Sequence, residues 1–181
     1  MIHSIEYGPA RREDTMQLTL TIPDRLAGLL RRLLERKAAR PLQMAAAPAF
    51  MLRHSNPAGL WSSPRLTQMV EVQGARMIYL SGQTPADQHY RVRGTDVRTQ
   101  AQAVYDNIET ALKAAGANWD NVVKTTTYLT DAALIADFRE ARMERFRHLK
   151  AAPANTLLIV NRLAEPEFLI EIDVIAAVPA T

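Results

Sequence analysis

The segment of residues 166–178, PEFLIEIDVIAAV, limits the possible folds of this chain more than any other. One face has apolar residues at the two-residue period of a strand: Ile170, Ile172, Val174 and Ala176. The other face carries Glu171 and Asp173. These acids have two explanations. The face is in contact with water, or Glu171 lines a cleft and takes part in chemistry there.

The rest of the body alternates between strand-like and helix-like segments. Strand patterns cover residues 66–72 (LTQMVEV), 76–81 (RMIYLS), 121–130 (NVVKTTTYLT) and 155–160 (NTLLIV). A turn at Gly74 joins the first two. One helix is predicted from Thr95 or Asp96 to Gly116, and a second begins at Asp131. The order β-β-α-β-α-β-β predicts the α+β class, with one sheet of four or five strands and two helices on one face.

The second face of that sheet has no predicted cover within the chain. Met69, Ile78 and Leu80 indicate that the sheet is only partly polar, so another subunit is a reasonable cover.

The first fifty residues differ from the remainder in charge and pattern. Residues 1–50 hold eight Lys/Arg and five Asp/Glu, which accounts for the whole net charge of +3, and residues 51–181 hold fourteen of each. We therefore expect an N-terminal extension, 1–50, that is disordered or not native, and a body, 51–181, for which Met51 is a candidate natural start. A leucine stripe in the extension is typical of a basic amphipathic helix: Leu26, Leu29, Leu30, Leu33 and Leu34. Such a helix would either contact a membrane surface or a partner, or be a loosely attached appendage.

Composition excludes several function classes. The chain has no cysteine, so disulfides, thiolate metal sites and a cysteine nucleophile are excluded. The four histidines, at positions 3, 54, 89 and 148, are too scattered to predict a metal site. The neutral body argues against nucleic-acid binding. No apolar run has the length of a membrane span, and the expected location is cytoplasmic.

Four segments of the body together resemble one family. They are YLSGQTPAD, NIETALKAAGANWDNVVKTTTYLTD, APANTLLIV and LAEPEFLIEIDVIAAV, within residues 56–179. In order and spacing they are similar to the Rid (YjgF, reactive intermediate deaminase) family. The resemblance implies a homotrimer of chorismate-mutase-like α+β subunits around a central barrel, with clefts for a small-molecule substrate between subunits.

The resemblance also implies hydrolysis of reactive enamines or imines to carbonyl compounds and ammonia, without a metal or an organic cofactor. Glu171 matches the family glutamate that orients the attacking water. Asn155 stands where the better-known members have an arginine that binds the substrate carboxylate, and Leu157 stands at a position commonly small or cysteine. The tyrosine that usually precedes the first strand falls near Leu66, and Trp61 is a candidate to fill its space.

Three further residues are candidates for substrate binding. Ser81 and Gly82 follow a strand and offer a hydroxyl and a backbone N–H, although a turn that uses glycine for its backbone freedom explains them equally. Arg142 lies one helical turn after Phe138, so it is expected on the inward face, where its charge would replace the missing arginine. The alternative for Arg142 is a solvated helix surface.

Two functions of different classes follow. One is a Rid-like deaminase with a non-standard substrate, and the other is a non-catalytic trimer that binds small metabolites in the same clefts. Glu171 and Ser81 favour the enzyme, whereas Asn155 and Leu157 favour the binding protein.

Overall fold

The computed structural model describes residues 23, 26–29, 31–32, 48–63 and 65–180. The chain divides into two units, Met1–Ala46 and Ala47–Thr181. In the first unit, residues 26–29 and 31–32 are helical, and Leu26 and Leu29 are exposed. The remaining leucines of the predicted stripe and most of the predicted extension lie outside the described residues. Within the described part of the chain, no helix has the length and apolar character that crossing a membrane requires.

The second unit contains eight strands and helices of regular length. They are β1 (Met51–Ser55), β2 (Met69–Gln73), β3 (Ala75–Gln83), α2 (Val97–Ala114), β4 (Val122–Leu129), α3 (Ile135–Phe146), β5 (Ala154–Ile159) and β6 (Ile170–Pro179). Short 3₁₀ turns at Trp119–Asn121 and Ala132–Leu134 precede β4 and α3. The predicted α+β class is confirmed, with one additional strand, β1.

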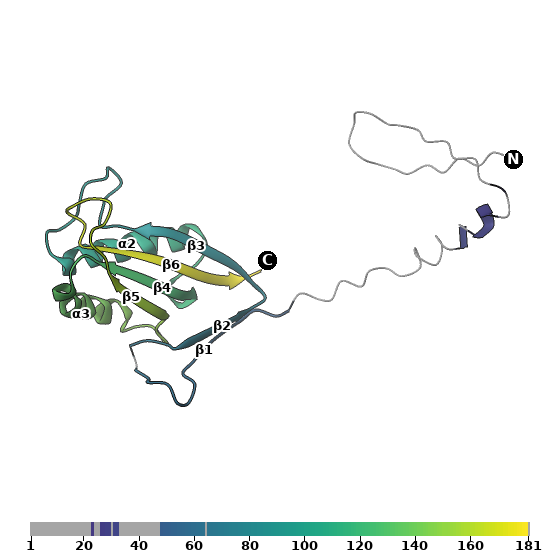
Figure 1. The fold of residues 1–181 in the computed structure, drawn as a ribbon, viewed down its shortest axis with the longest axis horizontal. Coiled ribbons are helices and arrows are strands. Elements are labelled where there is room, and N and C mark those ends of the chain that lie inside the picture. Colours follow the sequence, from purple (N-terminus) through teal and green to yellow (C-terminus); the bar gives the residue numbers. More distant parts are fainter. Residues whose placement is uncertain (1–22, 24–25, 30, 33–47, 64, 181) are drawn as a thin grey trace. The chain divides into compact units, whose positions relative to one another are not determined.

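Four of the strands form one sheet in the order β3-β6-β4-β5, in which β4 and β5 are parallel and the other neighbours are antiparallel (Figure 1). A separate two-stranded sheet pairs β1 with β2. The sequence predicts one sheet for the segments on either side of Gly74. Instead β2 pairs with the unpredicted β1, and the turn at Gly74 leads into β3 of the larger sheet.

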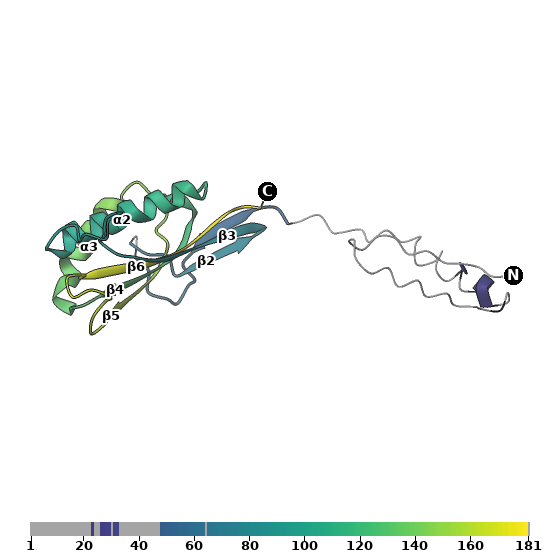
Figure 2. The same ribbon diagram turned by 90° about the horizontal axis from the view of Figure 1, so that it is seen from above.

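Both helices cover the same face of the four-stranded sheet (Figure 2). The apolar side of β6 packs against them, and Ile170, Ile172 and Val174 are almost completely buried. Helix α2 begins where the Asp96 carboxylate accepts a hydrogen bond of 2.9 Å from the Thr99 backbone N–H, as the capping pattern predicts. This packing fixes which side chains of β6 point away from the core.

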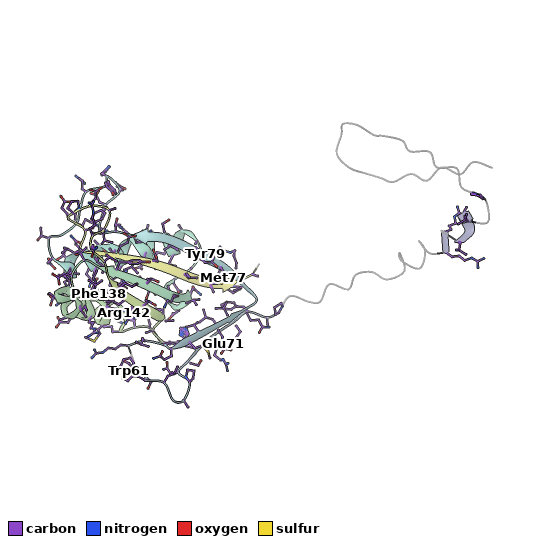
Figure 3. All side chains as sticks on the ribbon, in the orientation of Figure 1. Trp61, Glu71, Met77, Tyr79, Phe138 and Arg142 are labelled. Carbon is purple, nitrogen blue, oxygen red and sulfur yellow. The ribbon has the colours of Figure 1, made fainter. Side chains whose placement is uncertain are left out.

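We call the opposite side of the four-stranded sheet the open face. Glu171, Asp173 and Ile175 of β6 lie on it, because they alternate with the buried residues. Tyr79 on β3 is 73% exposed and Met77 is 36% exposed (Figure 3). These side chains give the open face an apolar area beside its acids.

Residues 48 and 49 lie against the turn between β2 and β3. A Cβ atom added to Gly74, whose φ is +61°, would lie 2.1 Å from the Pro48 carbonyl oxygen and 2.8 Å from that of Ala49. The packed unit therefore includes residues just before Met51.

We expect Gly74→Ala to destabilise a chain that begins at Ala47 by on the order of 2 kcal/mol, from left-handed backbone strain and from the clash with Pro48. In a chain that begins at Met51 the clash is gone, so the same substitution should cost about 1 kcal/mol. Urea unfolding measures both values. Gly59→Ala is the control, because Gly59 has a φ of +88° and open space around it, so its cost should be equal in both chains. Equal costs for Gly74→Ala would contradict the packing.

Candidate functional site

Glu171 lies near the start of β6 on the open face of the sheet. It pairs in register with Tyr128 of the neighbouring strand β4. Burial raises the pKa of the Glu171 carboxyl above its ordinary value, and the negative charge of Asp173 raises it further. A carboxyl with a raised pKa exchanges protons near neutral pH more readily than an ordinary glutamate.

Strand β3, which pairs with the other edge of β6, packs closely against the Glu171 carboxylate. Ser81 and Gly82 of β3 together lie opposite the single residue Asp173, so β3 has a β-bulge at this point. A Cβ atom added to Gly82 would lie 1.8 Å from Oε1 of Glu171. A side chain at position 82 would therefore displace the Glu171 carboxylate from this place, and the backbone of Gly82 is not in the left-handed region that favours glycine. Ser81 is exposed beside it.

Tyr128 was not singled out by the sequence, although its strand was predicted. Its hydroxyl donates a hydrogen bond of 2.8 Å to Oδ2 of Asp173. This bond raises the pKa of the Tyr128 hydroxyl, with smaller contributions from burial and from the charges of Asp173 and Glu171. Since one strand face repeats every second residue, β4 and β6 bring a phenol and two carboxylates together, and this could be found only once their register was known.

Asn155 and Leu157 lie on the other face of the sheet, toward the helices. The Thr125 hydroxyl, which is buried, donates a hydrogen bond of 2.8 Å to Oδ1 of Asn155. Leu157 packs against the hydrophobic core. Strand β4 separates β5 from β6. Within one chain, neither side chain therefore meets Glu171.

Arg142 is inward, as the helical spacing predicts. It is 9% exposed, its Nη1 donates a hydrogen bond of 2.6 Å to the Arg65 carbonyl oxygen, and its guanidinium lies 4.8 Å from the centre of the Phe146 ring. Burial lowers its pKa. Its Nη2 is buried and has no hydrogen-bond partner among the residues that the structure describes. It lies on the helix side of the sheet with Phe138 (Figure 3) and not with Glu171.

Trp61 is in the connection between β1 and β2 and is 69% exposed (Figure 3). Its carbonyl oxygen accepts a hydrogen bond of 2.6 Å from Nε2 of Gln68. The indole ring is free to contact a ligand or another chain, and the structure gives it no contact with Glu171.

One cation, Lys124 of β4, also lies on the open face. Its Nζ donates a hydrogen bond of 2.5 Å to Oγ1 of Thr156, and burial lowers its pKa. Lys124 pairs in register with Ile175, four residues along β6 from Glu171. The backbone positions of the two residues are therefore separated by about 13 Å along the sheet. Among the residues that the structure describes, no group of His, Asp or Glu is arranged to hold a metal ion.

Comparisons with known proteins agree on one family. A family model described as Endoribonuclease L-PSP matches residues 62–178. A RutC family protein of Pyrococcus abyssi is 34% identical over 135 residues, which are 74% of this chain and 98% of the relative. The crystal structure of a Rid family protein, YyfB from Yersinia pestis, matches with a TM-score of 0.65 and 30% identity over 70% of this chain and 98% of that one. A second Rid family protein of Yersinia pestis, YyfA, matches with a TM-score of 0.54 and 28% identity over 65% and 90%.

The raised pKa of Glu171 predicts how stability depends on pH. The folded chain holds the Glu171 proton more tightly than the unfolded chain. The stabilisation of the folded chain by this proton is therefore fully present below the ordinary pKa of glutamate, and it is lost as pH rises through the raised pKa of the folded chain. The melting temperature of the wild type, relative to Glu171→Gln at equal protein concentration, should therefore fall over this window and be flat on either side.

Asp173→Asn provides the control for the cause of this shift. The charge of Asp173 is one of the two causes of the raised Glu171 pKa, and burial is the larger one. In Asp173→Asn, the pH range over which the melting-temperature difference falls should therefore become narrower but should not disappear. A difference between wild type and Glu171→Gln that does not change with pH would contradict a raised pKa.

Proposed function

This chain belongs to the Rid (YjgF) family, the family of the Endoribonuclease L-PSP model, and from that membership we propose that it hydrolyses a reactive imine or enamine. Membership supports a deaminase-like or small-molecule-binding role in general. The products of the proposed reaction are a carbonyl compound and ammonia.

The observation that carries the proposal is the Glu171 carboxylate, packed against Gly82 and raised in pKa. In the proposed reaction Glu171 accepts a proton from water as the water oxygen bonds to the imine carbon, and the C=N electron pair moves to nitrogen. Glu171 then gives this proton to nitrogen, which completes a carbinolamine. A second proton next moves from the carbinolamine hydroxyl to nitrogen through Glu171, and the C–N bond breaks as ammonia leaves and the carbonyl forms. One carboxyl performs both transfers, which requires a pKa nearer to neutral than that of an ordinary glutamate. An enamine enters the same sequence after protonation at carbon.

The second candidate is a non-catalytic protein that binds small metabolites. It is favoured by Asn155, which supplies hydrogen bonds and no charge, and by the core packing of Leu157. Losing a charge-assisted contact to a carboxylate costs about 1.5–3 kcal/mol, so a small imino acid would bind weakly at this position. Ribonuclease activity is not proposed, because His54, His89 and His148 lie on β1, in a turn and after α3.

We further propose that the site lies between subunits of a homotrimer. Asn155 and Glu171 of one chain are on opposite faces of the sheet, so a single cleft can include both only when neighbouring chains supply them. Met77 and Tyr79 on the open face provide apolar surface for this association. Arg142, whose buried Nη2 has no partner within the described part of the chain, is the proposed cation on the Asn155 side of such a cleft, and Trp61 and Ser81 are proposed substrate contacts.

Light scattering at micromolar concentration should give a mass near three times the 20.2 kDa of one chain. Tyr79→Glu combined with Met77→Glu should yield folded monomers, because charges on the open face oppose its burial. Arg139→Glu, on the exposed side of α3, is the control and should leave the trimer intact. A stable wild-type monomer would contradict the shared cleft.

Asn155→Arg should increase the hydrolysis of freshly generated 2-iminobutanoate about tenfold or more, because the arginine restores a charge-assisted contact to the carboxylate. Glu171→Gln should abolish this gain, since an amide cannot accept the proton. Release of keto acid above the buffer rate is the measurement. Because leucine at position 157 is bulkier than the small residue or cysteine expected there, Asn155→Arg is also tested with Leu157→Cys. No gain in either variant would favour the binding protein.

Mixed trimers test whether the cleft is shared. A chain with both Asn155→Arg and Glu171→Gln should be inactive alone, and the wild type lacks the added arginine. When the two are refolded together, some clefts combine the arginine of one chain with Glu171 of its neighbour. The mixture should then exceed the sum of its parts in activity. A strictly additive result would contradict a cleft shared between chains.

A further inference from the structure

A tyrosine with an unfavourable backbone conformation contacts the connection that leads into β6, the strand that carries Glu171. Among the residues that the structure describes, Tyr90 is the one non-glycine residue with a positive φ, which is 61°. Side chains with a Cβ are rarely found in this conformation, and glycine adopts it without steric cost. Residues held in such conformations often lie at functional sites, so the position calls for an explanation.

The turn that carries Tyr90 is firmly held. The Asp87 carboxylate accepts hydrogen bonds from the backbone N–H groups of His89 at 2.8 Å and Arg91 at 3.0 Å, and from Nε of Arg91 at 2.9 Å. These bonds, chiefly the one from the Arg91 backbone, lower the pKa of Asp87 to about 2. Tyr90 is thus presented on a fixed turn, and its conformation is set by its neighbours.

The Tyr90 side chain reaches the connection that leads into β6. Its hydroxyl donates a hydrogen bond of 3.2 Å to Oε1 of Glu165, and its ring meets the ring of Phe168 edge-on, with centres 6.0 Å apart. Phe168 is buried and precedes Glu171 by three residues. Burial and the bond to Glu165 raise the pKa of the Tyr90 hydroxyl, with smaller contributions from the charges of Glu165 and Glu171.

Much of this ring is still available for contact. Tyr90 is 61% exposed although one edge is against Phe168. A planar substrate group could stack on the Tyr90 ring. Because the ring is already held in place, such binding would cost little conformational entropy.

We propose that Tyr90 is a specificity-determining residue of the Glu171 site, and that its ring stacks on a planar aromatic or conjugated group of the substrate. The inference rests on the proposed function and deepens it. The preferred substrates are imines or enamines whose C=N or C=C group bears an aromatic or conjugated substituent, and small aliphatic imines are poorer.

Calorimetric binding of two product-type keto acids to the full chain tests this without turnover. Phenylpyruvate should bind at least tenfold more tightly than 2-oxobutanoate to the wild type. Tyr90→Phe keeps the ring and should retain the preference. Tyr90→Gly should reduce the preference to within twofold. Its melting temperature should stay close to that of the wild type, because glycine relieves the strained φ as the contact with Phe168 is lost.

His89→Ala is the matched control, since it alters the same turn but keeps the backbone bonds to Asp87 and the Tyr90 ring. It should leave the preference unchanged. The inference is overturned if Tyr90→Gly keeps the preference, if His89→Ala abolishes it equally, or if the wild type binds neither keto acid at millimolar concentration.

Hydrolysis assays separate this inference from the proposed function. If neither the phenyl-bearing imine nor 2-iminobutanoate is hydrolysed, but binding still depends on the Tyr90 ring, the deaminase proposal fails and the recognition role of Tyr90 stands. If both are hydrolysed at rates that Tyr90→Gly leaves unchanged, the deaminase stands and the role of Tyr90 is refuted.

Discussion

The alternation of β6 between an apolar face and an acidic face is the constraint on which the rest of the structure depends. β6 is paired on both edges, with β3 and β4, so its register is held from two sides. A slip of one residue would turn Glu171 and Asp173 into the core under α2, where unpaired carboxylates are very costly to bury. The position of the site is therefore fixed by the same pattern that fixes the core.

Segments with strong local patterns were predictable from the sequence, and long-range pairing was not. The Asp96 cap and the stop near Gly116 defined α2, and the period of two defined β6. β1 was missed because MLRHS is short and has no clear alternation, and its pairing with β2 removed β2 from the larger sheet. Nothing local in residues 69–83 shows that Gly74 separates two sheets.

The candidate site divides in the same way. The sequence proposed Glu171 from its strand and Gly82 from its place after residues 76–81, but the structure puts Gly82 within β3, at the bulge opposite Asp173 and against the Glu171 carboxylate. Asn155 was assigned to the same cleft by resemblance alone. The parallel pairing of β4 with β5 sets which side each residue faces, and it turns Asn155 toward the helices. Side-chain direction on an edge strand depends on its partner, and no short motif encodes it.

The negative charge near Glu171 favours one step of the proposed reaction, the activation of the C=N group, although Asn155 supplies no cation. Asp173 lies beside Glu171, and Lys124 is about 13 Å along the sheet, so the surroundings of Glu171 are acidic. Acidic surroundings weaken the binding of a substrate carboxylate, but they stabilise a protonated imine, which is a cation and the more electrophilic form. In the proposed reaction, the uncharged Asn155 then shifts the balance from holding a carboxylate to activating the C=N group. An uncharged planar substituent recognised by Tyr90 is consistent with that balance.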